Sequence, residues 1–152
     1  MVAPVALRAQ DPSVHVREGR LALSTYDEDP PDPNPQFPAF SSDPFPNYPY
    51  TNRQPVGQVR HTEQWRTIVL EDEYLTCRVL PDLGGHLHGC IDKTTGKEIF
   101  YANPAVRSGM GGGRAFIATG IESSFPIAHS RVSGSPVDFA YSDRDGIGTV
   151  VV

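Results

Sequence analysis

The sequence has little of what charge-driven or membrane-spanning proteins require. Its 13 Lys and Arg residues are outnumbered by 18 Asp and Glu, which gives a formal net charge of -5 at pH 7. Nucleic acids and anionic membrane surfaces are bound by concentrated basic faces, so we expect neither as a main partner. No apolar run approaches the roughly 18 residues of a transmembrane helix. The first ten residues lack the features of a secretory signal, so the sequence predicts a cytoplasmic protein.

Cysteine is also scarce. Only Cys77 and Cys90 are present, they are not spaced as C-x-x-C, and each lies in its own apolar segment. Two cysteines do not form a disulfide framework, and free cysteine is among the most buried residue types. We therefore expect two reduced cysteines in the core, with a disulfide between them as the alternative.

Sustained helical periodicity is missing as well. Short apolar and β-branched segments, separated by turn residues, recur instead every 8–12 residues or so, a pattern typical of β-sandwiches. Residues 104–113 are expected to form a glycine-rich loop, and residues 14–26 one strand or a short hairpin. Further strands are expected at residues 65–70, 75–80, 86–92, 98–101, 114–118, 137–141 and 147–152. The fold class predicted is all-β and antiparallel.

Proline is concentrated in one part of the chain. Nine of the 15 prolines lie between residues 29 and 55, a density that excludes helix and central strand. Six of the 14 aromatic residues lie in or beside this stretch, and a solvated linker would gain nothing from them. We expect an ordered, extended strap, with a loose linker as the alternative. The expected organisation is an N-terminal strand segment (1–28), the strap (29–57) and part of a β-sandwich (58–152).

The last residues read as an apolar strand without a polar tail. A strand edge of this kind is exposed and hydrophobic unless something pairs with it. We therefore expect residues 58–152 to be the N-terminal part of a sandwich that needs the missing C-terminal part of its own domain. Alone, this segment would be inactive, with an uncovered apolar face. The alternative is a short protein whose last strand docks internally.

Chemistry-bearing residues gather between residues 109 and 130. Glu122 lies among small and apolar residues, where a carboxyl group could act as general acid or base. Arg114 could clamp a ligand oxygen, and His129 could exchange a proton near neutral pH. The alternative is a Glu122–Arg114 ion pair that only holds the loop. The glycines before Arg114 are not followed by Gly-Lys-Ser/Thr, which excludes a phosphate-binding loop.

His86 and His88 form an H-x-H pair on an expected strand, so both side chains should point to the same side. A metal site would need a third ligand, for which the sequence offers only distant candidates: His61, His129 and Asp92. We interpret the pair as polar residues of a strand face and expect neither a metal nor a cofactor.

Several separate motifs together resemble one family. They include Val79-Leu80-Pro81-Asp82-Leu83-Gly84-Gly85, Asp92-Lys93-Thr94-Thr95-Gly96, and Gly120-Ile121-Glu122 followed by Phe125-Pro126-Ile127 and Ser135-Pro136-Val137-Asp138. In this order they resemble a bacterial domain of unknown function that is similar to the galactose mutarotase-like superfamily. That domain often precedes tetratricopeptide repeats.

The resemblance implies a partial β-supersandwich with a carbohydrate or glycoside ligand on its concave face. It implies a sugar-processing role, such as a glycoside hydrolase or aldose epimerase, in the full-length chain. The residues offered for catalysis are Glu122 and His129. Those offered for substrate binding are Arg114, His86, Phe125 and Tyr101, with His86 standing where the family usually has Arg. The alternative is a non-catalytic carbohydrate-binding or interaction module attached to downstream repeats.

Overall fold

The computed structural model describes residues 13–28, 34, 55–111, 114–122 and 134–152. Side chains are described for these residues except in a few strand segments, at residues 28, 55–58, 108–111 and 114–116. The strap expected at residues 29–57 lies almost entirely outside the described residues. Within the described ranges, no helix is long and apolar enough to cross a membrane.

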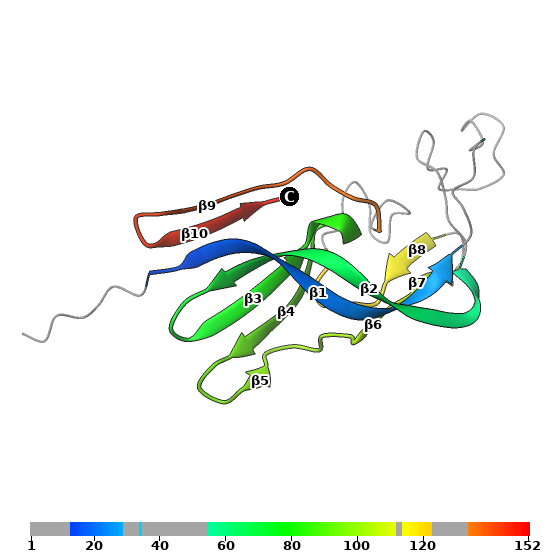
Figure 1. The fold of residues 1–152 in the computed structure, drawn as a ribbon, viewed down its shortest axis with the longest axis horizontal. Helices are drawn as coiled ribbons and strands as arrows, with labels where there is room; N and C mark the ends of the chain where they lie inside the picture. The colour runs from blue at the N-terminus through cyan, green and yellow to red at the C-terminus, as the bar shows by residue number, and fades with distance from the viewer. Residues whose placement is uncertain (1–12, 29–33, 35–54, 112–113, 123–133) are drawn as a thin grey trace, which may run out of the picture.

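A twisted, mostly antiparallel sheet forms the body of the described chain (Figure 1). Its strand order among the described residues is β5-β4-β3-β2-β1-β6, and only the β1–β6 pairing is parallel. The strands are β1 (His15–Glu28), β2 (Pro55–Glu71), β3 (Leu75–Leu80), β4 (His86–Asp92), β5 (Lys97–Glu98) and β6 (Ala105–Val106). The described residues otherwise contain further strands and one short 3-10 turn, η2 (Pro81–Leu83), so the all-β class is confirmed.

Two long strands dominate the sheet. The stretch expected as one strand or a short hairpin forms the single strand β1, which pairs with β2 from His15 opposite Glu71 to Tyr26 opposite Arg60. β2 begins at Pro55, well before the expected start at residue 65. Residues 59–64 of this strand are mostly polar and exposed, so the apolar pattern that predicts a strand is weak there. Pairing with β1 satisfies its backbone groups all the same.

The segment after β4 differs from expectation in two ways. The strand expected at residues 98–101 is reduced to the two residues of β5. The glycine-rich stretch 104–113, expected as a loop, contains β6 and also β7 (Ser108–Gly111), which pairs with β8 (Arg114–Ile117). Glycine lowers strand propensity, but a ladder of backbone hydrogen bonds does not depend on side chains. The loop prediction was therefore wrong at these residues.

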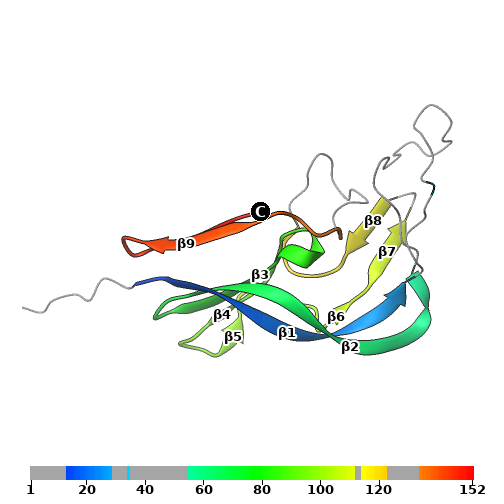
Figure 2. The same ribbon diagram turned by 45° about the horizontal axis from the view of Figure 1, so that its top comes forward.

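A hairpin covers one face of the sheet as a second layer (Figure 2). It consists of β9 (Ala140–Arg144) and β10 (Ile147–Val151), joined by Asp145 and Gly146, which both have positive φ as a tight two-residue turn requires. Its first strand lies three residues later than predicted. The Arg66 guanidinium, 5.4 Å from the Phe139 ring centroid, holds the segment before β9 to the sheet.

The core lies where the sheet meets η2 and the β6–β8 region. Its buried members are Leu23, Leu80, Leu83, Val106 and Ile117, with Leu21 and Trp65 packed against them. Leu80 is completely buried. Because η2 follows Leu80 directly and β4 follows η2, packing of this core fixes where β4 begins and hence where His86 lies.

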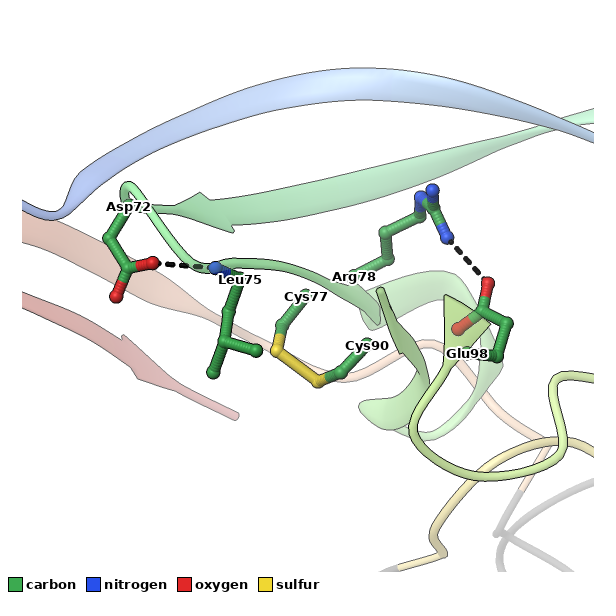
Figure 3. The surroundings of a disulfide bond; sticks show 6 residues. All are labelled: Asp72, Leu75, Cys77, Arg78, Cys90 and Glu98. Carbon is green, nitrogen blue, oxygen red and sulfur yellow. Dashed lines mark hydrogen bonds and ion pairs between the residues drawn. A yellow bond between two sulfur atoms is a disulfide. The ribbon is translucent and has the colours of Figure 1, made fainter. Parts of the chain in front are cut away.

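The expectation of reduced cysteines is corrected by the structure. Cys77 of β3 and Cys90 of β4 lie directly opposite each other, with Cα atoms 4.0 Å apart, and form a disulfide (Figure 3). Strand register decides whether two cysteines meet, and register could not be read from their spacing. The neighbouring Arg78 forms an ion pair with Glu98 of β5, with 3.3 Å between Nη1 and Oε1.

Candidate functional site

The candidate site forms where residues 119–122 dock against β4. Leu87 and Ile121 exchange two backbone hydrogen bonds, of 3.1 Å from the Leu87 amide and 2.9 Å from the Ile121 amide. In an antiparallel bridge, the residues on either side of the paired ones face each other on the opposite side. Glu122 is thereby brought to His86, and Gly120 to His88. The side chain of His88 then reaches the hydroxyl of the preceding Thr119. Both histidines of the H-x-H pair therefore meet the same segment.

His86 is completely buried at the start of β4. Its Nδ1 is hydrogen-bonded to the Leu83 carbonyl in η2. A carbonyl oxygen only accepts hydrogen bonds, so Nδ1 must carry a proton. In the neutral ring, Nε2 is then the nitrogen with the lone pair. The tight turn η2 thus sets both the position of the imidazole and the direction in which its free nitrogen points.

The Nε2 atom of His86 faces Glu122. The distance from Nε2 to Oε2 of Glu122 is 3.8 Å, and the Glu122 side chain is only 15% exposed. Nε2 is buried and has no hydrogen-bond partner among the described residues. A buried polar atom without a partner is uncommon in folded proteins, and a catalytic role is one of its explanations. A nitrogen lone pair and a carboxylate side by side are a pair suited to accepting or passing a proton.

His88 forms the second polar contact with this segment. Its ring is buried, and its Nδ1 is hydrogen-bonded to the hydroxyl of Thr119, which is buried too. Burial lowers the pKa of His88 below its ordinary value, and the nearby positive charge of Arg78 lowers it further. The strand pairing of β4 with β3 shifts at this residue, because Arg78 is opposite Gly89 while Val79 is opposite Leu87. His88 is thus the extra residue of a β-bulge.

Gly120 allows this close docking. A Cβ atom at position 120 would lie 1.9 Å from the Leu87 carbonyl oxygen and 2.6 Å from that of His88, and φ is +48°. Both the space and the backbone conformation therefore require glycine. Without it, Thr119 and Glu122 could not reach the two histidines together.

Of the remaining residues proposed from the sequence, Tyr101 is the one whose side chain lies among the described residues. Tyr101 is 75% exposed in the connection between β5 and β6. Arg114 lies in β8, but its side chain is outside the described part of the chain, as are Phe125 and His129. No three His, Cys, Asp or Glu residues among those described gather in a way that could hold a metal ion.

Sequence reasoning did not identify the roles of Thr119 and Gly120. Glycine before an acidic residue is too common to indicate a site, and the His88–Thr119 contact spans 31 residues of sequence. The backbone bridge between Leu87 and Ile121 brings the two segments together, and an isolated bridge leaves no periodic pattern in a sequence.

Comparisons with known proteins place this site in context. The structure is similar to a crystal structure described as a TPR-domain containing protein from Parabacteroides distasonis ATCC 8503, with a TM-score of 0.74 and 27% sequence identity. The similarity covers 91% of this chain but only 24% of the other, so the chain spans about a quarter of that protein's length. A family model described as "Domain of unknown function (DUF5107)" matches residues 42–152. The chain therefore belongs to this family, whose region contains β2 to β10 and the whole His86–Glu122 site.

Proposed function

We propose that the chain supplies part of a saccharide site in a carbohydrate-active protein, with His86 and Glu122 in contact with the sugar ring. The observation that carries this proposal is the buried Nε2 atom of His86, which has no hydrogen-bond partner among the described residues and lies 3.8 Å from Glu122. Two acceptors side by side favour a ligand that donates hydrogen bonds. A sugar ring presents neighbouring hydroxyl groups that do so.

The charge of the pair argues against anionic ligands. A phosphate or sulfate brought to Nε2 of the neutral ring would place its negative oxygens beside the Glu122 carboxylate, and like charges repel strongly in a buried site. The formal net charge of -5 acts in the same direction. A neutral saccharide meets neither obstacle, which agrees with the similarity to galactose mutarotase-like proteins expected from the sequence motifs.

Glu122 and His86 would share the proton chemistry in an enzyme of this kind. In opening or hydrolysis at the anomeric carbon, a hydroxyl proton is removed and a ring or leaving oxygen is protonated. The proposal also keeps the roles expected from the sequence for Arg114, which would bind a ligand oxygen, and for His129, which would exchange a proton. A glycosidase would need a second carboxylate, which would come from outside the described residues.

A second candidate function is a non-catalytic carbohydrate-binding or interaction module. The observation in its favour is the description of the similar crystal structure as a TPR-domain containing protein. In such a protein, the saccharide site would bind without turnover and the repeats would hold a partner. Both candidates use the same pair of residues, so one set of variants can separate them.

Replacement of Glu122 by glutamine tests the proposal. The probes are a panel of aldoses, whose anomeric exchange is followed by proton NMR, and 4-nitrophenyl glycosides, whose hydrolysis is followed by absorbance. In the complete polypeptide as the gene encodes it, an acid–base role predicts a loss of turnover of about hundredfold with saccharide affinity nearly unchanged. A binding module predicts no turnover in the wild type and an affinity loss of about tenfold in Glu122→Gln.

The matched control is Glu73→Gln, because Glu73 is exposed in the turn between β2 and β3. It should leave both quantities unchanged. A wild type that neither binds nor converts any sugar of the panel, or a Glu122→Gln variant that equals Glu73→Gln in every assay, would rule the proposal out.

A further inference from the structure

His88 lies beside the proposed site without facing its ligand. It does not contact Glu122 in any described interaction, yet it is buried, and its hydrogen bond ends on the segment that carries Glu122. Within the described part of the chain, the backbone of that segment pairs with β4 through one bridge, at Leu87 and Ile121. A bridge of one residue pair is a weak attachment, so the contact between His88 and Thr119 is a substantial part of what holds it.

We propose that neutral His88 is the positioning residue of the site: through Thr119 it fastens residues 119–122 to β4 and so holds Glu122 against His86, and its protonation releases this segment. The proposal depends on the proposed function only for the consequence at Glu122. The attachment itself can be measured without any ligand.

The charges around His88 explain why the ring must be neutral. Arg78 on β3 acts against a second positive charge here, and His86 on β4 does so whenever its own ring is charged. Glu98 on β5 acts in favour of that charge but is already paired with Arg78. Glu122, the charged residue of the docked segment, lies at His86 rather than at His88. Burial opposes the charged form most of all, and together these effects lower the pKa of His88.

The sign of the pH dependence follows from this lowered pKa. When the segment opens, His88 is exposed and regains an ordinary pKa of about 6.5. Above that pH both states are neutral and opening is independent of pH. Below it the open state binds a proton that the closed state does not, so opening becomes about tenfold easier per pH unit until the closed state is protonated too.

Hydrogen exchange at two amides measures the opening directly. The amides of Leu87 and Ile121 donate the two hydrogen bonds of the bridge. Between about pH 7.5 and pH 5, we expect their protection factors to fall by about tenfold or more. The Ile99 amide, which donates to the Cys90 carbonyl at the other end of β4, is the internal reference and should change much less.

The variant His88→Asn separates titration from structure. The terminal amide of an Asn side chain lies about where Nδ1 of histidine lies, so it can form a hydrogen bond with Thr119. Unlike histidine, Asn does not titrate. We expect protection at Leu87 and Ile121 to become independent of pH within about threefold, whereas the exposed-histidine control His15→Asn should behave as the wild type.

Thr119 variants keep the test decisive if His88→Asn does not fold. Thr119→Val should lower protection at Leu87 and Ile121 by about tenfold already at neutral pH, and Thr119→Ser should restore it. The proposal is overturned if wild-type protection at these amides follows Ile99 over the whole pH range, if His88→Asn keeps the wild-type pH dependence, or if Thr119→Val equals Thr119→Ser. None of these results involves a saccharide, so they are distinct from a failure of the proposed function.

Discussion

Replacement of Leu80 by alanine is expected to lower the free energy of unfolding by about 3 to 4 kcal/mol. Leu80 is completely buried in the cluster with Leu23, Leu83, Val106 and Ile117. Removing its side chain deletes buried apolar atoms and leaves a cavity between the sheet and the β6–β8 region, where the rigid strands can close it only in part. Urea unfolding followed by tryptophan fluorescence measures the loss, because Trp65 packs against the same cluster.

Leu75→Ala is the matched control for this substitution. Leu75 stands at the other end of β3 and is 36% exposed, so the same chemical change should cost less than about 1 kcal/mol there. Equal losses at the two positions would mean that the described core is not the part of the molecule on which its stability depends.

Removal of the Cys77–Cys90 disulfide is expected to cost about 3 kcal/mol of unfolding free energy. The bond joins residues 13 apart in sequence and restricts the unfolded chain, whereas β3 and β4 already hold the two positions together in the folded state. The double variant Cys77→Ala/Cys90→Ala measures this cost without burying a hydroxyl group at position 90, where the side chain is buried.

A reducing agent supplies the control for the disulfide. Wild type in excess dithiothreitol should unfold at nearly the same urea concentration as the double variant, and the variant itself should not respond to the reagent. If the oxidised and reduced wild type unfold together, or if mass spectrometry of the purified, air-exposed protein finds two free thiols, the cross-link does not stabilise this fold. Disulfides persist where conditions are oxidising, so all samples need a defined redox state.

The sequence predicted the middle of the sheet well and its margins poorly. β3 and β4 have the predicted bounds, because their apolar residues alternate with polar ones or follow one another between clear turn residues. The early part of β2 and the short strand β7 were missed, since the first is polar and the second is rich in glycine. Both are strands because of the partner that pairs with them, and a partner distant in sequence leaves no local signal.

Pairing between distant segments also decides the candidate site. Glu122 was selected because a lone carboxylate among small and apolar residues is unusual, and His86 because of the resemblance to a family motif. That these two residues face each other depends on the bridge between Leu87 and Ile121, which joins segments 34 residues apart (Ile121 minus Leu87). The disulfide was misjudged for a related reason, because it depends on the register between β3 and β4.

The cytoplasmic location and the need for a further part of the domain stay predictions. The first was based on the absence of a secretory signal in the sequence. The second was based on the apolar character of residues 147–152 in the sequence. In the structure, Ile147, Val151 and Val152 are exposed.

We propose that His86 offers a neutral acceptor nitrogen to a saccharide beside Glu122. Long-range proton–nitrogen NMR of the histidine rings tests it most directly, with the His86 signals identified by their loss in His86→Gln. Near neutral pH, we expect a proton on Nδ1 alone and a shift of the Nε2 resonance when a sugar from the panel binds. A ring protonated on both nitrogens, with an Nε2 signal that no sugar moves, would instead indicate an ion pair with Glu122 that only holds the segment in place.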